Sequence, residues 1–210
     1  MISLFIDTSC KNVSISVVKD NEILSLITKD IPNMHSVYTT SFLKQALDDA
    51  KIKPNEVDNI YVVNGPGSFT GLRIGVTIAK TYGFLIDKYI TPVSSLKAIA
   101  LSTNYKGIIM SIIPANKTHY YIGIYNELYE TIYEEQFTNI DTINELIIKY
   151  HPYLVGVDEL NILDNQINII SLDILKIINY YQNEEKINYH KLVPNYLKLP
   201  QAIEDKKVKE

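Results

Sequence analysis

Apolar and polar positions in the first part of the chain alternate with a period of two, the spacing of strands that are buried on one face. Val13, Ile15 and Val17 alternate with serines, and a polar turn at residues 19–21 separates this run from the next. Farther along, apolar residues recur every three or four positions, as on the inner side of a helix. The pattern predicts strands at 3–7, 13–17 and 23–27, a helix that His35 and Ser36 open and that runs to residue 50, a strand at 60–63 and a helix at 70–84.

The second half of the chain repeats this order of three strands, helix, strand and helix. The pattern predicts strands at 108–113, 120–125 and 129–137, a helix capped by Asp141, a strand at 154–157 and a helix at 172–181. One order used twice favours a duplicated α/β lobe over a single doubly wound sheet. We expect lobes at 1–104 and 105–210 with a hinge at 102–106, residues 191–210 packed back on the first lobe, and a frayed end at 201–210.

Composition narrows the class of protein. The 210 residues are 46% hydrophobic, enough for a packed core, and the formal net charge of -4 disfavours autonomous nucleic-acid binding. A single cysteine, Cys10, can close no internal disulfide and build no multi-cysteine metal site. The sequence begins without a basic leader and contains no apolar run of about 20 residues. We therefore expect a globular, cytoplasmic protein without a membrane partner.

Five of the 8 glycines and the one arginine, Arg73, fall within residues 65–83. The segment follows a strand and opens a helix, where unpaired amides favour an anion and where Ser68 or Thr70 can act as the cap. A Walker loop is excluded because Leu72 and Arg73 stand where lysine and a hydroxyl residue are needed. A dinucleotide loop is excluded because three strands precede it. The loop comprises Gly65, Pro66, Gly67, Ser68, Phe69 and Thr70.

Small residues recur every fourth position along the helix that follows, at Gly71, Gly75, Ala79 and Gly83. Each interior glycine costs about 1 kcal/mol relative to alanine, a cost that close backbone approach can offset. The stripe packs either on its own sheet and helices or on another subunit, and the pattern alone leaves both open. Arg73, near the helix start, is expected to pair with a carboxylate or a backbone carbonyl.

The run from Gly65 to Gly75 resembles the signature of the bacterial TsaB (YeaZ) family. Residues 6–9, 92–96 and 194–198 resemble that family too, although Lys198 stands where arginine is usual. The resemblance implies an actin-like (ASKHA, RNase H-like) fold of two βββαβα lobes. It also implies a role in forming threonylcarbamoyladenosine at position 37 of tRNAs that read ANN codons. A TsaD-like transferase and a TsaE-like ATPase are the implied partners, with ATP or ADP bound only at the level of the complex and tRNA contacted only through it.

Catalytic groups of the related transferase have no counterpart in the sequence. The two positions of its His-x-x-x-His metal pair correspond to Ser95 and Ile99, and isoleucine cannot be a ligand. Asp7 matches a carboxylate of actin-like ATPases, but Thr8 and Ser9 replace the glycine that lets phosphate approach. We therefore expect no catalytic, cofactor or metal residue in the chain. The tyrosine-rich segment 119–125 is interpreted as a sheet edge in preference to a base-stacking surface.

The predicted working surface is the face of the helix at 36–50 and of the glycine helix, in contact with a TsaD-like subunit or with a second copy of the chain in a two-fold dimer. Its contact residues are Tyr38, Phe42, Gln45, Gly71, Arg73, Gly75, Ala79 and Lys80. The alternatives are a free-standing actin-like ATPase or kinase, a glycoprotease-type peptidase, and a tRNA-binding module with a patch at Lys191 and Lys198.

Overall fold

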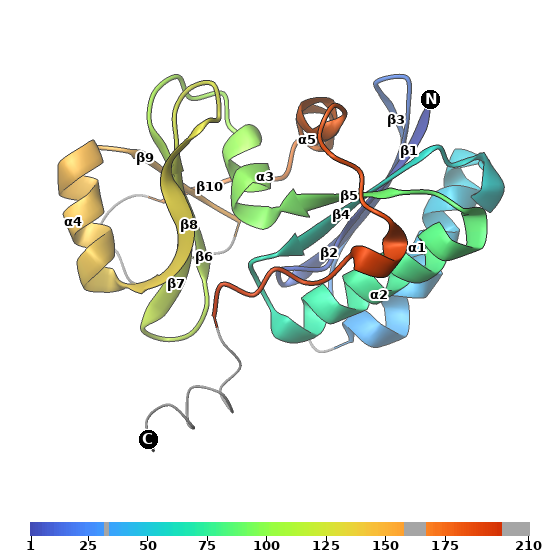
Figure 1. Ribbon diagram of the computed structural model, residues 1–210, viewed down its shortest axis with the longest axis horizontal. Helices are drawn as coiled ribbons and strands as arrows, with labels where there is room; N and C mark the ends of the chain where they lie inside the picture. Colours follow the sequence, from blue (N-terminus) through green and yellow to red (C-terminus); the bar gives the residue numbers. More distant parts are fainter. Residues whose placement is uncertain (32–33, 158–166, 199–210) are drawn as a thin grey trace, which may run out of the picture.

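A computed structural model of the chain describes residues 1–31, 34–157 and 167–198. It contains two α/β lobes side by side, each with one five-stranded sheet (Figure 1). The first lobe consists of β1 (Ile2–Asp7), β2 (Asn12–Lys19), β3 (Glu22–Asp30), α1 (His35–Ala50), the short turn η1 (Pro54–Glu56), β4 (Asn59–Gly65), α2 (Phe69–Ile86), β5 (Ile90–Ser94) and α3 (Ser95–Leu101). The second consists of β6 (Ile109–Pro114), β7 (His119–Tyr125), β8 (Thr131–Asn139), α4 (Ile140–Tyr150), β9 (Tyr153–Gly156), β10 (Asn168–Ile169) and α5 (Ile174–Tyr181). The turn η2 (Tyr189–Lys191) follows and packs on α2 of the first lobe.

Strand order shows that the second lobe repeats the first. The sheets run β3-β2-β1-β4-β5 and β10-β9-β6-β7-β8, so the first strand of each lobe lies in the middle. In both sheets the first three strands pair antiparallel, and the fourth and fifth are added parallel. This is the RNase H-like arrangement of actin-like proteins, and the predicted α/β fold class is confirmed.

The predicted elements need three corrections. The first lobe continues beyond the predicted order with a fifth strand and a further helix, β5 and α3, whereas in the second lobe only the strand β10 was not predicted, and it precedes the predicted helix, α5. Asn139, not Asp141, caps α4, because the Asn139 side chain accepts a hydrogen bond from the amide of Thr142 at 3.1 Å. The segment 119–125 is no sheet edge, since β7 lies between β6 and β8.

The helices α3 and α5 lie between the two sheets (Figure 1). One face of the first sheet is covered by α1 and α2, which bury Leu4 and Ile6 of β1. The opposite face carries Phe5, which packs with Ile177 of α5. In the second lobe, α4 covers the outer face and α3 the inner face, where Ile99 packs against the sheet. Burying one such side chain contributes roughly 1.5–3 kcal/mol, so both sheets are held by their two covered faces.

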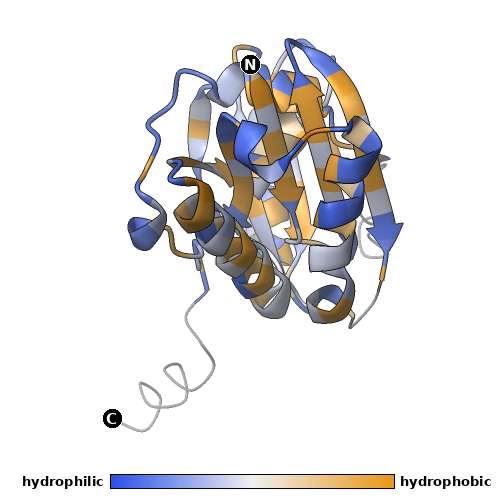
Figure 2. Ribbon diagram, turned by 90° about the vertical axis from the view of Figure 1, so that its right-hand side faces the viewer, coloured by the Kyte–Doolittle hydropathy of each residue, from blue (hydrophilic) through white to orange (hydrophobic). Residues whose placement is uncertain are grey.

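Hydropathy follows this layering. Figure 2 shows apolar stretches along the strands and on the helices that cover them. No helix among residues 1–31, 34–157 and 167–198 is long and apolar enough to span a bilayer.

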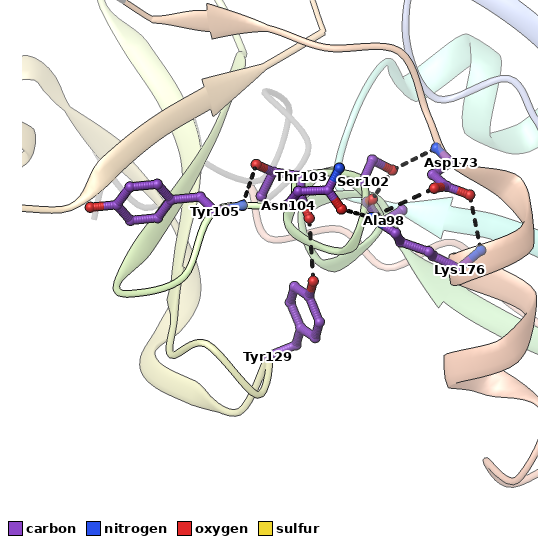
Figure 3. A network of polar contacts seen from close by, with 8 residues as sticks. All are labelled: Ala98, Ser102, Thr103, Asn104, Tyr105, Tyr129, Asp173 and Lys176. Carbon is purple, nitrogen blue, oxygen red and sulfur yellow. Dashed lines mark hydrogen bonds and ion pairs between the residues drawn. The ribbon is translucent and has the colours of Figure 1, made fainter.

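The link between the lobes, predicted as a hinge, is fastened to the start of α5 (Figure 3). The Ser102 hydroxyl donates to the Ala98 carbonyl at 2.7 Å and accepts from the amide of Asp173 at 2.8 Å. Lys176 donates to the Asn104 side chain at 2.6 Å and forms an ion pair with Asp173 at 3.7 Å. The two chain segments that pass between the lobes are thus bonded to each other.

Candidate functional site: the signature loop and the outer helix face

The glycine-rich loop closes on the turn between β1 and β2. Ser68 caps α2, accepting a hydrogen bond from the Gly71 amide at 3.3 Å, so the first of the two predicted caps is the one used. The Ser68 amide donates to the Ser9 carbonyl at 2.7 Å. A Cβ atom on Gly67 would overlap that same carbonyl oxygen. Glycine is therefore required here for the approach of two backbone segments.

Residues 187–198 form a strap that runs back along the first lobe, drawn in red in Figure 1. Ile187 and Ile90 exchange backbone hydrogen bonds of 2.8 and 2.9 Å, and Leu192 is fully buried in the first core. Lys80 donates to the carbonyls of Leu192 at 3.1 Å and His190 at 3.3 Å. Lys80 is thus bonded within its own chain, and its predicted part in a partner contact has no support in the structure.

The end of the strap clamps the signature loop. The Asn195 amide donates to the Asn64 carbonyl at 2.7 Å, and the Asn195 carbonyl fills the place of a Cβ on Gly65, whose φ is +137°. Tyr196 stacks on Phe69 with ring centroids 4.8 Å apart. This contact was not predicted from the sequence, although the two motifs at 65–75 and 194–198 were its signal. In the folded chain, the motif at 194–198 lies over the motif at 65–75.

Arg73 binds a side chain of the strap and not the carboxylate or backbone carbonyl that its position in the sequence predicts. Its Nε donates to the Tyr196 hydroxyl at 2.9 Å, so the prediction of a carboxylate or carbonyl partner is wrong. Its side chain otherwise remains exposed at the start of α2. Arg73 therefore joins the loop to the strap while leaving its charge at the surface.

The small-residue stripe of α2 faces its own sheet. A Cβ on Gly71 would overlap the Thr8 carbonyl oxygen, and one on Gly75 would overlap the Thr8 hydroxyl, which donates to the Gly71 carbonyl at 2.7 Å. Ala79 is fully buried in the first core. The prediction that Gly71, Gly75 and Ala79 contact a partner is wrong, and the open alternative, packing on their own sheet, is the correct one.

The exposed side of the α1–α2 pair carries the remaining predicted contacts. Tyr38 is 39% exposed and stacks with Phe42 at 5.9 Å. Gln45 is exposed on the same side of α1, and Ile78 of α2 is half-buried. The two helices pack against each other in the fold (Figure 1). We define Tyr38, Phe42, Gln45, Ile74 and Ile78 as the outer helix face; these five side chains are uncharged and largely apolar, and the exposed Asp49, which accepts a hydrogen bond from Gln45 at 3.5 Å, lies beside them.

The positions tested for catalysis are used inside the fold. Ser95 and Ile99 are buried in α3, and Ser95 donates to the Pro66 carbonyl. Asp7 is 6% exposed and accepts from the Ser9 amide at 2.8 Å. Burial raises the pKa of Asp7, an effect that its hydrogen bonds from Ser9 and the nearby His35 partly oppose. Ser95 therefore holds the loop and Asp7 the β1–β2 turn, while Ile99 packs in the core of the second lobe.

The structure also bears on two other candidate functions, base stacking by segment 119–125 and metal binding. Tyr120 and Tyr125 are fully buried, so they offer no face for base stacking, while His119 stacks on Phe137 at 4.8 Å. Across residues 1–31, 34–157 and 167–198, no three His, Cys, Asp or Glu side chains form a group that could hold a metal. The expected frayed end at 201–210 lies outside the described residues.

Comparisons with known proteins agree on one family. A model described as TsaD, tRNA N6-adenosine threonylcarbamoyltransferase, matches residues 29–168. The tRNA threonylcarbamoyladenosine biosynthesis protein TsaB of Bacillus subtilis is 29% identical over 224 residues, which cover 96% of each chain. A tRNA N6-adenosine threonylcarbamoyltransferase of Thermomicrobium roseum is 34% identical over 113 residues, 46% of this chain and 31% of that protein.

Solved structures agree on the fold. A Pseudomonas aeruginosa protein described as similar to the peptidase YeaZ superposes with a TM-score of 0.78 at 20% identity, covering 94% of this chain and 99% of that one. YeaZ from Pseudomonas aeruginosa gives 0.72 at 19% identity, with 93% and 99% covered. Because the family model matches residues 29–168, more than half of the sequence, the chain belongs to the TsaD family, and it is similar to TsaB of Bacillus subtilis along nearly its whole length.

Proposed function

We propose that the chain is a non-catalytic subunit that binds a TsaD-like transferase through the outer helix face and thereby supports threonylcarbamoyladenosine formation. The product would be made at position 37 of tRNAs reading ANN codons, in the cytoplasm, with a TsaE-like ATPase as a further partner. The observation that carries the proposal is a largely apolar helix face that leaves Tyr38 and Phe42 partly uncovered in a chain similar to TsaB over nearly its whole length.

The state of the signature loop supports a role without hydrolysis. The Ser9 carbonyl occupies the space beside the Cα of Gly67, and the Thr8 carbonyl occupies the space beside that of Gly71. A phosphate therefore has no room to approach the two glycines from this side. Asp7 is bonded within its own turn. An ATPase or kinase would need both the glycine loop and the carboxylate open to a nucleotide and its metal. The outer helix face requires neither.

The proposal is tested by reversing the character of one exposed side chain on that face. Tyr38→Glu should weaken association with the TsaD-like partner about 100-fold, because a carboxylate would be buried against apolar surface, a cost of about 2.7 kcal/mol. The readouts are co-purification, the dissociation constant, and tRNA modification by the reconstituted complex. Ile148→Glu on α4 is the matched control, since Ile148 is also an exposed apolar residue on an outer helix.

Two results would contradict the proposal. One is wild-type association of the Tyr38→Glu chain; the other is equal loss with Ile148→Glu. Without a partner, the same face should pair with a second copy, so sedimentation should detect a dimer that the Tyr38→Glu change dissociates and that the transferase subunit displaces.

A further inference from the structure

The hairpin of β7 and β8 in the second lobe is bonded to the first lobe at a place apart from the outer helix face. Ser94, at the end of β5, caps α3 by accepting a hydrogen bond from the Lys97 amide at 3.2 Å, and its hydroxyl donates to the Glu135 carboxylate of β8. The same carboxylate oxygen accepts a hydrogen bond from the Tyr125 hydroxyl at 2.8 Å. Glu135 is therefore bonded by one hydroxyl from each lobe.

Lys97, in the first turn of α3, directs its amine toward the second lobe. Its Nζ lies 4.4 Å from the ring centroid of Tyr125 and 5.6 Å from that of Tyr180 on α5. It also donates a hydrogen bond to the Tyr129 carbonyl, in the turn between β7 and β8. An ammonium group withdrawn from water is attracted to aromatic faces more strongly than an exposed one. All three of these partners come from the second half of the chain, so the lysine side chain spans the boundary between the lobes.

The charges around Lys97 also come from the second half of the chain. Burial lowers the pKa of the Lys97 amine, and nearby carboxylates partly oppose this effect. These carboxylates are those of Glu135, Glu184, Glu134 and Glu130. The first lobe thus supplies the cation, and the second half of the chain supplies the aromatic faces and the negative charge beside it.

Two more contacts attach the same hairpin to the first half of the molecule. The Tyr129 hydroxyl donates to the Thr103 carbonyl of the interlobe link at 3.3 Å (Figure 3). Farther along β8, the ring centroid of Phe137 lies 5.3 Å from the Nζ of Lys198, at the end of the strap. Closure of two lobes around a ligand needs a hinge that is free to turn. A turn of the lobes about the link would break the contacts at Glu135 and Phe137.

We propose that Ser94, Lys97, Tyr125 and Glu135 form an interlobe latch that fixes the angle between the two lobes. The latch depends on the charge of Lys97, because a neutral side chain in its place would lose the attraction to the rings and to the carboxylates. As a result, the chain moves as one rigid body, and the cleft of about 940 Å³ between the lobes keeps its width. This inference goes beyond the proposed function and does not rest on it.

Distances between spin labels on the two lobes test the latch in the full chain. Ser41→Cys on α1 and Asn144→Cys on α4 give exposed attachment points, once Cys10→Ser has removed the native thiol. Labelled chain is diluted with unlabelled chain, so that only distances within one copy are measured. Double electron–electron resonance should then give one narrow distance distribution. Lys97→Met should broaden this distribution about twofold, whereas Lys97→Arg, which keeps the charge, should leave it narrow.

Lys149→Met is the matched control, because the Lys149 amine also lies over a tyrosine ring, 4.8 Å from that of Tyr150, but both residues belong to α4. It should leave the distribution unchanged. Thermal unfolding checks that each variant is folded; if Lys97→Met is not, Glu135→Ala, which removes the acceptor on the other lobe, takes its place and should broaden the distribution too. A distribution as narrow as that of the parent chain, or equal broadening by Lys149→Met, would overturn the proposal. Neither result bears on the outer helix face, whose test uses the transferase partner.

Discussion

The helices α1 and α4 occupy the same place in their lobes, after the third strand and on the outer face of the sheet, yet their solvent sides differ. On α1, Val37 is 59% and Tyr38 39% exposed, and α2 packs beside them. On α4 the one large exposed hydrophobic residue is Ile148, among Asp, Asn, Glu and Lys positions. Figure 1 shows α4 alone at its end of the molecule and α1 with α2 at the other.

This difference locates the specialised part of the duplicated fold. In the first lobe, the small residues of α2 let this helix lie close to its sheet, and the strap packs along one side of the helix. The small residues are therefore buried in contacts within the lobe, and larger apolar residues remain at the surface. After duplication, the second lobe can therefore serve only as a folded support, while the first presents the helices α1 and α2 to a partner.

The largest expected effect concerns the close approach of α2 to β1. Alanine at an interior helical glycine usually stabilises a helix by about 1 kcal/mol. Gly71→Ala should instead lower the free energy of unfolding by about 3 kcal/mol, because the Thr8 backbone carbonyl occupies the place of the new Cβ. Urea denaturation measures the change.

The second lobe offers the matched comparison. At Gly123 the atoms nearest a new Cβ belong to the side chains of Tyr125 and Glu135, which can shift more readily than backbone. Gly123→Ala should therefore cost less than Gly71→Ala. Equal costs at the two glycines would remove the distinction between the lobes.

An intermediate effect is expected where the strap meets the signature loop. Tyr196→Ala removes the stacking on Phe69 and the hydrogen bond from Arg73, each worth about 1 kcal/mol, and should destabilise the first lobe by about 2 kcal/mol. Tyr196→Phe keeps the stacking and should cost about half as much. Hydrogen exchange at residues 64–73 reports whether the loop loosens; unchanged protection in the alanine variant would show that the strap does not hold it.

The smallest effect concerns the ends of the two equivalent strands, since β1 ends on the buried Asp7 and β6 on Pro114. Because burial raises the pKa of Asp7, the folded chain holds its proton more tightly than the unfolded chain. This carboxyl therefore lowers stability progressively as pH rises through and above its ordinary pKa, and has no such effect at lower pH.

Asp7→Asn should consequently make the protein slightly more stable at neutral pH and leave its stability at pH 3 unchanged. The measurement is urea denaturation at both pH values. A loss of stability at neutral pH would mean that the ionised carboxylate is needed by the turn. Binding of the TsaD-like partner should persist in this variant, because Asp7 lies away from the outer helix face.

Sequence patterns predicted most strands, the duplicated order and the Ser68 cap, because these depend on residues near one another in the chain. They could not decide what lies against the stripe at Gly71, Gly75 and Ala79, since periodicity identifies a bare face but not its neighbour. The burial of segment 119–125 was missed for a related reason: strand order in a sheet depends on distant pairing. The strap contact at Tyr196 joins residues more than 120 positions apart.

The position of α3 and α5 has a consequence for any attempt to divide the protein. Each helix belongs by sequence to one lobe but shields the sheet of the other, Ile177 packing with Phe5 and Ile99 packing beside β6. If the chain were divided after residue 104, each of the two fragments would expose an apolar sheet face that a helix of the other fragment normally covers. We expect them to aggregate when produced separately and to reassemble when produced together.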